Sequence, residues 1–316
     1  MMRQSDYSNP GRAFIKRFGV PKNRQDLDCY VERYAAFLLE DAEALSLPVD
    51  LEKICWRYGI QWSSGTLPEG TDGFSDGHNG YILVNEDHAE VRQRFTHCHE
   101  LVELLFAALQ EAPVPEEVWH FLDGPTKEWL CNRGGAAILL PLGLFEDEAI
   151  SSDVSLDAAR SLGERFGASR IATLLALVER GPGLHALVAW RRKLKPTQER
   201  ATSGGRQLGL GFGFDIVPQP LMRVEWVCTT RRADAPFIPK DKSVPDDSVI
   251  ARTAAGELCP PCHEEIDIGK ECLPCLVEAL CAGTGRAEVI SLLHLPGDDC
   301  GMYRTEASAD NSPLWT

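Results

Sequence analysis

The sequence lacks a long apolar run. Its longest nearly unbroken apolar stretch, residues 136–145 of 316, is far shorter than the roughly 20 residues that a membrane-spanning helix needs. Residues 1–22 also lack the apolar core of a secretory signal. We therefore expect a cytoplasmic protein with no membrane partner.

Positive charge is also scarce. The chain has 32 Lys and Arg against 47 Asp and Glu, and its formal net charge is −15. Because a negative surface repels the phosphate backbone, direct DNA binding is not expected of the chain as a whole. Residues 191–206 are a local exception, with six basic residues against one acidic residue. This strip is either a solvated linker or a docking strip for an acidic partner or DNA.

The pattern of cysteines argues against a disulfide framework. Eleven cysteines, an odd number, are spread over the whole length. Secreted disulfide-rich domains are short and usually carry an even number, so this pattern favours reduced thiols or metal ligation. A hydrophobic content of 44% is sufficient to build the cores of two or three domains.

Residues 96–103, Thr-His-Cys-His-Glu-Leu-Val-Glu, are close to the zinc-peptidase motif HExxH. That motif places two ligands one helical turn apart, with a glutamate beside the first ligand to activate the metal-bound water. His99 and Glu103 keep the ligand spacing, and Glu100 keeps the general-base position. An apolar face without Gly or Pro over residues 91–109 predicts the required helix. The alternative is a chance match to a short pattern.

A second helix, predicted over residues 128–141, could supply a third ligand. It is rich in small residues and ends at Pro141, so it can approach the motif helix closely. Glu128 lies in its first turns, where the distal glutamate of a gluzincin-type site would lie.

Together, the segments RFTHCHELVELL and EWLCNRGGAAILLP resemble the ImmA/IrrE (PprI) family of metallo-endopeptidases, whose signature is RFTxxHExxH followed by ExxCNxxAAxLLxP. The resemblance runs from about Cys29 to Pro141. It implies that His99 and Glu128 bind the metal and that Glu100 is the catalytic glutamate. The family's second histidine falls on Glu103. The resemblance also implies cleavage of an XRE-type, helix-turn-helix transcriptional repressor in a stress or DNA-damage response.

Glutamate in place of the second histidine changes the expected metal chemistry. A carboxylate can close a four-coordinate zinc site through oxygen, but more oxygen ligands shift the preference toward manganese or iron(II). The alternative is a site that has lost its metal and survives as a scaffold. His97 lies about 200° round the helix from His99 and is expected to point away. Cys98 is expected to be a small core residue.

A short strand is predicted over residues 80–85, bounded by Gly and Asn. In metallopeptidases of this kind such a strand offers an edge on which an extended substrate pairs, here through Tyr81, Ile82, Leu83 and Val84. A buried sheet strand is the alternative. Upstream, Pro48 and Asp50 mark the expected start of a helix that is followed by Gly59.

After Pro141 the pattern is helical up to about Leu194. A Ser cap, a Gly167-Ala168-Ser169 turn and two apolar faces predict a helix-turn-helix-like arrangement. Its second helix offers Arg170, Thr173 and little else to bases or phosphates, so a packing role is favoured over DNA recognition. The family resemblance implies a helix-turn-helix-like domain here as well.

The C-terminal region resembles the GAF-like sensor domain of radiation-response members of the family. It also carries two Cys-x-x-Cys pairs, Cys259 with Cys262 and Cys272 with Cys275. This spacing predicts a structural zinc site. The alternative is a redox dithiol, with Cys272 and Cys275 at the start of a helix over residues 276–280, where the helix dipole lowers thiol pKa values.

These observations predict an α+β protein with a zincin-like metallopeptidase domain. The predicted divisions are a flexible N-terminus (1–28), the zincin-like domain (29–141), a helix-turn-helix-like helical domain (142–195), a Gly-rich linker (196–213), a GAF-like α/β sensor domain with the Cys cluster (214–296) and a tail (297–316). The predicted function is a zinc- or manganese-dependent endopeptidase acting on a helix-turn-helix repressor. The alternatives are an inactive peptidase-like protein that binds the repressor, and a DNA-binding regulator that uses the helical domain and the basic strip.

Overall fold

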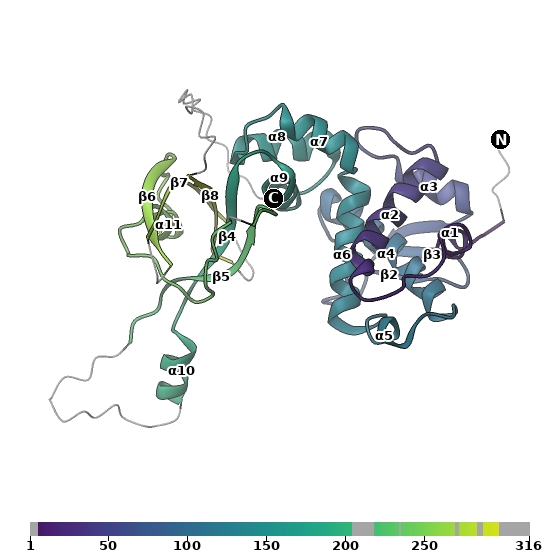
Figure 1. Cartoon of the computed structure of the whole chain (residues 1–316), viewed down its shortest axis with the longest axis horizontal. Coiled ribbons are helices and arrows are strands. Elements are labelled where there is room, and N and C mark those ends of the chain that lie inside the picture. The colour runs from purple at the N-terminus through teal and green to yellow at the C-terminus, as the bar shows by residue number, and fades with distance from the viewer. Residues whose placement is uncertain (1–5, 204–217, 234, 269–271, 283–286, 297–316) are drawn as a thin grey trace. The chain divides into compact units, whose positions relative to one another are not determined.

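The computed structural model describes residues 6–203, 218–233, 235–268, 272–282 and 287–296 (Figure 1). The chain divides into two compact units, residues 1–151 with 159–173 and residues 152–158 with 174–316. The predicted tail and residues 204–213 of the predicted linker lie outside the described residues.

The N-terminal unit combines helices with a small sheet (Figure 1). Its elements are α1 (Pro10–Phe18), α2 (Asp26–Asp41), α3 (Leu51–Tyr58), β1 (Gln61–Gly65), β2 (Gly73–Asp76), β3 (Tyr81–Asn85), α4 (Glu90–Gln110), α5 (Glu116–Trp119), α6 (Gly124–Leu139) and α7 (Leu142–Ile150). The long helix α4 is the centre of the unit, because α1, α2, α6, β2 and β3 all pack on it. The predicted motif helix is therefore confirmed.

Two predicted helix boundaries are confirmed by their caps. The Asp50 side chain accepts a hydrogen bond from the Lys53 amide at the start of α3. The same helix ends at Gly59, whose φ of +65° lies in the left-handed region that favours glycine.

Helix α6 packs so closely against α4 that only glycine fits at the contact. A Cβ atom on Gly134 would meet Val102 Cγ2 at 2.8 Å, and one on Gly135 would meet the His99 backbone nitrogen at 3.2 Å. The predicted close approach of the two helices is thus made by two glycines, and it brings the first turns of α6 to the ligand face of α4.

The three-stranded sheet has the order β1-β3-β2. Strand β3 pairs in parallel with β1 and antiparallel with β2, so both of its backbone edges are used. The prediction that residues 81–84 form a substrate edge is therefore wrong, and Tyr81, Ile82, Leu83 and Val84 belong to the central strand. The edge strand that borders the motif helix is β2.

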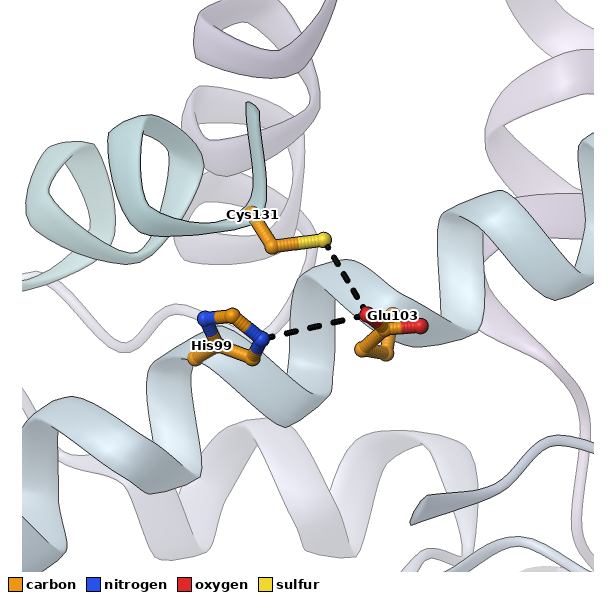
Figure 2. A group of neighbouring side chains, drawn as sticks. All are labelled: His99, Glu103 and Cys131. Atoms are coloured by element: carbon orange, nitrogen blue, oxygen red, sulfur yellow. Dashed lines mark hydrogen bonds and ion pairs between the residues drawn. The ribbon is translucent and has the colours of Figure 1, made fainter. Parts of the chain in front are cut away.

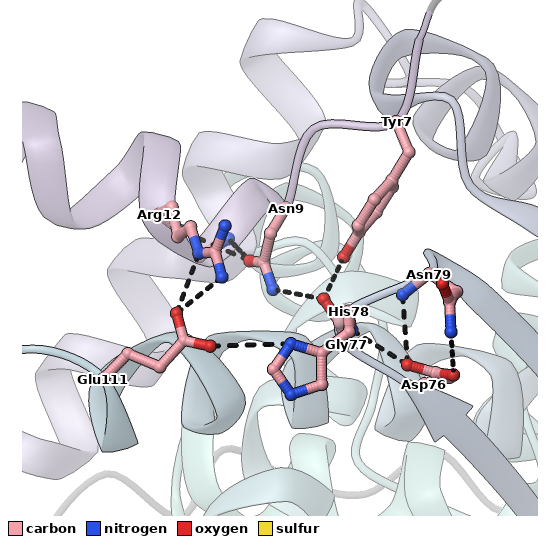
Figure 3. A network of polar contacts seen from close by, with 9 residues as sticks. Tyr7, Asn9, Arg12, Asp76, Gly77, His78, Asn79 and Glu111 are labelled. Carbon is pink, nitrogen blue, oxygen red and sulfur yellow. Dashed lines mark hydrogen bonds and ion pairs between the residues drawn. The ribbon is translucent and has the colours of Figure 1, made fainter.

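A polar network fixes the turn that follows β2 (Figure 3). Tyr7 Oη and Asn9 Nδ2 donate to the Gly77 carbonyl oxygen at 2.8 and 3.3 Å. Asn9 Oδ1 also accepts from the Gly11 amide at the start of α1. Asp76 closes the turn by accepting from the backbone amides of the next residues. The network ties β2 to the N-terminal segment.

The N-terminus is more ordered than predicted. Residues 10–18 form α1, whose Phe14 side chain is completely buried among aromatic rings of α2. A Cβ atom on Gly11 would meet Leu105 Cα at 2.7 Å, so α1 also packs tightly on α4. Residues 10–18 of the segment predicted to be flexible are therefore a packed helix, which the sequence did not reveal because its apolar face spans barely two turns.

The C-terminal unit is built on a five-stranded antiparallel sheet with the order β5-β4-β8-β7-β6. Its strands are β4 (Leu184–Lys193), β5 (Leu221–Thr229), β6 (Cys262–Asp267), β7 (Cys272–Cys281) and β8 (Val289–Leu295). Helix α11 (Val249–Ala254) packs on β7 and β8 (Figure 1). The buried Trp190 indole donates to Ser291 Oγ at 2.7 Å, which satisfies its polar atom within the sheet.

Several predictions for the region after Pro141 need correction. Helices α8 (Leu156–Phe166) and α9 (Arg170–Arg180) form with the predicted turn and Ser caps, but residues 184–193 form β4 instead of continuing the helices. The stretch Leu184–Trp190, apolar except for His185, is a buried strand, a pattern that periodicity does not separate from a buried helix. Residues 196–203 of the predicted linker form α10 (Pro196–Ser203).

Within the described part of the chain, no helix has the length and apolar character needed to cross a membrane.

Candidate metal centre

The motif residues project from one face of α4. His99 and Glu103 are one turn apart, and the distance from His99 Nε2 to Glu103 Oε1 is 3.8 Å (Figure 2). Cys131 of α6 points at the same carboxylate, with its Sγ 3.5 Å from Glu103 Oε1. The ligand atoms of these three residues all lie within 4.8 Å of one another, and they are the one such group among the residues that the structure describes.

The hydrogen bond on the far side of the His99 ring sets its tautomer. His99 Nδ1 lies 3.0 Å from Asn132 Oδ1, an amide oxygen that can accept a hydrogen bond from Nδ1–H. Nε2 then faces the carboxylates with its lone pair available. This is the arrangement that metal-ligating histidines use.

The two oxygens of Glu103 have different partners. Oε1 faces His99 and Cys131, whereas Oε2 accepts a hydrogen bond of 2.8 Å from Lys127 Nζ. Burial disfavours the charge on Lys127, but the hydrogen bond and charge of Glu103 outweigh it and raise the pKa of Lys127. The lysine therefore stays charged and holds the carboxylate with Oε1 turned inward.

Glu128 lies at the rim of the site. Its Oε2 is 3.6 Å from His99 Nε2, but its side chain is 58% exposed, against 15% for His99. The predicted ligands His99, Glu103 and Glu128 thus meet around the imidazole. Glu128 is outside the compact group, and Cys131 takes its place there.

Sequence reasoning missed Lys127 and Cys131 as members of the site. Both carry a signal that was available, because Cys131 is three residues beyond Glu128 and so shares its helix face, and Lys127 directly precedes it. Burial, and then the neighbouring Glu103 carboxylate, raise the pKa of the Cys131 thiol.

Glu100 lies on the β2 side of α4 and is buried. Burial raises the pKa of Glu100, and a hydrogen bond from Ser75 of β2 works against that rise. Gly73 makes room for this side chain, since a Cβ atom there would lie 3.1 Å from Glu100 Oε1 and 2.5 Å from Thr96 Cγ2.

One open cavity of about 600 Å³ is lined by residues of this site, but Cys131 is not part of its lining. One wall is formed by residues 70–75 of β2 and the loop before it, and the other by α4 and the first turns of α6. The cavity contains the His99, Glu100, Glu103 and Glu128 side chains. A buried carboxyl side chain, several potential metal ligands and an edge strand therefore share one space.

The donor set fits a divalent cation. Ligand atoms bound to tetrahedral zinc lie roughly 3.3–3.5 Å apart, given bonds of about 2.0–2.3 Å. The separations of 3.5, 3.6 and 3.8 Å around Glu103 Oε1 and His99 Nε2 are close to that value. Small side-chain shifts would bring the ligand atoms into coordination.

The neighbours of the motif behave as predicted. His97 is buried against Cys55 and Trp62, with its Nε2 3.1 Å from the Cys55 sulfur. Cys98 is completely buried. Neither residue belongs to the ligand group, which confirms their assignment to packing.

The four C-terminal cysteines are not brought together in this way. Cys272 pairs with Asp267, five residues along β6 from Cys262, which is roughly 17 Å at about 3.3 Å per residue. The predicted helix over residues 276–280 is part of β7, so no helix dipole acts on Cys272 or Cys275. Burial instead raises the pKa of Cys275 to about 12. The helix start expected at Cys272 and Cys275 is therefore wrong, and the four cysteines do not form a ligand group among the described residues.

The basic strip is partly neutralised. Lys193 lies 2.7 Å from Asp241 and also pairs with Glu225. Arg192 lies 3.9 Å from Asp246. These pairs reduce the positive potential that the sequence predicts for residues 191–195.

The site lies within the region that matches known proteins. Residues 63–177 match the family described as the IrrE N-terminal-like domain. The chain is 31% identical over 128 residues to the radiation response metalloprotease IrrE of Deinococcus deserti, and the alignment covers 39% of this chain and 45% of that protein. The chain thus spans less than half the length of this relative. A structure of a Mycobacterium tuberculosis transcriptional regulator aligns over 91% of this chain and 81% of its own chain. The TM-score is 0.48 and the sequence identity is 13%, so the likeness is weak.

Proposed function

We propose that this chain is a metal-dependent endopeptidase, because residues 63–177 match the IrrE N-terminal-like domain and part of the chain is similar to a metalloprotease. The observation that carries the proposal is the cavity that is lined both by the buried Glu100 and by the potential ligands His99, Glu103 and Glu128. His99, Glu103 and a residue of α6 would hold the cation.

Glu100 is the general base in this proposal. A bound cation would supply Lewis-acid activation of water and of the peptide carbonyl. The Glu100 carboxylate takes the proton of the attacking water and passes it to the departing amine. Burial raises the pKa of Glu100, which brings it closer to neutral pH and favours proton transfer in both directions.

The substrate would pair with β2 and not with β3. Strand β2 lines the cavity and uses one edge for β3, so an extended peptide can add to its other edge. Phe74, which is 55% exposed on this strand, offers an apolar contact to the peptide. The substrate we propose is a helix-turn-helix repressor of the XRE type, cut during a stress response. The name of the Deinococcus relative, which includes radiation response, supports this choice.

We assign zinc as the first choice of cation and manganese as the second, because the donor set mixes nitrogen, oxygen and sulfur. The five-stranded sheet of the C-terminal unit is proposed as a GAF-like sensor that regulates cleavage.

Cleavage of purified XRE-type repressors in the presence of zinc or manganese tests the function. Wild-type protein is expected to cut at least one repressor, and Glu100→Gln is expected to bind metal and repressor but not to cut. If no metal condition gives a product that Glu100→Gln abolishes, the proposal fails.

One observation favours an inactive, repressor-binding protein as a second candidate. The Lys127 ammonium lies 2.8 Å from Glu103 Oε2, so a positive charge already compensates this carboxylate. In that case the ion pair would replace the cation, and a stable complex with uncut repressor would form. Stoichiometric metal that is lost on His99→Ala would exclude this candidate.

A further inference from the structure

The most compact part of the site is not the ligand set that the sequence predicts. Cys131 Sγ, Glu103 Oε1 and His99 Nε2 form the group with mutual separations below 4.8 Å, and Glu128 is outside it. Figure 2 shows the Cys131 and His99 side chains directed at the same carboxylate from two helices.

We propose that Cys131 is a metal ligand of this chain and supplies, as a thiolate, the third donor beside His99 and Glu103. The inference rests on the proposed function, because it concerns the cation of the same site. It assigns His99 Nε2, Glu103 Oε1 and Cys131 Sγ to the cation and leaves Glu128 at the rim.

Burial distinguishes Cys131 from Glu128 as a ligand. Cys131 is completely buried and held by the packed face of α6, whereas the Glu128 side chain is 58% exposed. A long exposed side chain loses more rotamer freedom when it binds a cation than a short buried one does. The Cys131 to Glu103 separation of 3.5 Å is also the value expected of sulfur and oxygen bound to one zinc ion, roughly 3.5 Å.

Burial and the Glu103 carboxylate favour the protonated thiol of Cys131 in the cation-free site, so the cation itself must stabilise the thiolate. Lys127 neutralises part of the negative charge of Glu103 from the opposite oxygen, so the cation is not surrounded by excess anions. Without a cation, the Cys131 thiol donates a hydrogen bond to Glu103 Oε1. On binding, the metal–sulfur bond forms and the thiol proton leaves to solvent.

A sulfur donor changes the expected selectivity. Thiolates prefer zinc over manganese, whereas a histidine with two carboxylates is a harder site that suits manganese better. The proposal therefore predicts that replacement of Cys131 shifts the preference of the site from zinc toward manganese.

Cobalt substitution tests the proposal without an activity assay. Co²⁺ bound by a thiolate gives an intense near-ultraviolet charge-transfer band, in addition to its visible bands. We expect wild-type protein to show this band and Cys131→Ser to lose it while keeping the visible bands, with zinc affinity reduced by roughly 10-fold or more. Cys98→Ser, a buried cysteine on α4 outside the group, and Cys262→Ser in the C-terminal unit are the matched controls and should keep the band.

The outcomes of the Co²⁺ experiment distinguish the Cys131 proposal from the proposed peptidase function. If Co²⁺ binds stoichiometrically and depends on His99, but the thiolate band is missing from wild type or persists in Cys131→Ser, Cys131 is not a ligand and the proposed peptidase stands. If no cation binds at His99, both proposals fail. Should Cys131→Ser not fold, X-ray absorption of the zinc-loaded Cys259→Ser/Cys262→Ser protein decides, because a sulfur neighbour at about 2.3 Å supports the proposal and its absence overturns it.

Discussion

The α4–α6 helix pair and the β6–β7 hairpin both carry closely spaced potential ligands, but the helix pair brings them together and the hairpin separates them. In the helices, His99 and Glu103 face one way because they are one turn apart, and Cys131 meets them across a glycine-lined contact. In the hairpin, Cys272 and Cys275 are three residues apart on one strand and therefore point to opposite faces, one exposed and one buried.

This difference shows that sequence spacing predicts a metal site only together with the correct secondary structure. A Cys-x-x-Cys pair converges in a turn or at a helix start and diverges in a strand. Four predictions test the contrast, from the largest expected effect to the smallest.

The largest effect is expected from loss of the imidazole. His99→Ala removes the one nitrogen donor of the group, so the affinity for the metal should fall by roughly 100-fold or more. The metal content that remains after dialysis should fall with it. Cys272→Ala should leave metal content unchanged. Elemental analysis of both variants beside wild type measures this. Equal loss of metal in the two variants would break the contrast between helix pair and hairpin.

Acid should lower the free energy of unfolding of the N-terminal unit through the buried His97. Burial, and then the charge of Arg94, lower the pKa of His97 from 6.5 to about 4. Below pH 6.5 the unfolded chain takes up a proton that the folded unit refuses until about pH 4, so stability falls as the pH drops through this window. The full loss is roughly 3 kcal/mol, at about 1.4 kcal/mol per pH unit.

Urea unfolding at about pH 7 and about pH 5 measures the acid effect. His97→Gln should flatten the pH dependence of the N-terminal transition. The C-terminal unit carries its own buried histidine, since burial and then His294 lower the pKa of His185 to about 4, and its acid sensitivity should persist. An unchanged slope in His97→Gln would contradict the assignment.

The glycine contact between the helices should be sensitive to one methyl group. In Gly134→Ala the new Cβ would meet Val102 Cγ2 at 2.8 Å, and we expect overpacking to cost about 1–3 kcal/mol in urea unfolding and to weaken metal binding. Gly143→Ala in α7 is the control, because it has the same gain in helix propensity and no atom within 4 Å. Equal stability of the two variants would show that the helices have room to separate.

The smallest effect is expected in the hairpin. Cys272 is exposed, so Cys272→Ser should change the free energy of unfolding by less than about 0.5 kcal/mol. Cys275 is buried in the core of the sheet, and Cys275→Ser is expected to cost about 1–3 kcal/mol. A large loss in Cys272→Ser would indicate a bound metal or a disulfide at the hairpin.

Much of the N-terminal unit could be predicted because its signals are local. The Asp50 cap, the terminating Gly59 and the uninterrupted apolar face of α4 each specify an element from a few residues. The site residues on α4 follow from the HExxH-like motif, whose two ligand positions are one helical turn apart. What periodicity does not give is pairing between strands, and so the central position of β3 was missed.

The sequence also did not reveal β4 or the roles of Lys127 and Cys131, because these depend on tertiary packing. The apolar stretch Leu184–Trp190 has no alternation because both faces of β4 are buried, and its pattern matches a buried helix equally well. Lys127 and Cys131 were missed because their roles depend on how closely α6 approaches α4. That distance follows from Gly134 and Gly135 only when the register of the two helices is known.

The Lys127–Glu103 ion pair couples two positions of the chain. Histidine at position 103 would leave the lysine ammonium without its anion beside a cation, so restoring that histidine alone would be unfavourable. The residue at position 103 therefore restricts the residue at position 127, and the reverse, so the two positions are expected to covary. Related sequences with histidine at the position of Glu103 should lack lysine at the position of Lys127. A survey of related sequences can then separate chains with this pair from those with two imidazoles.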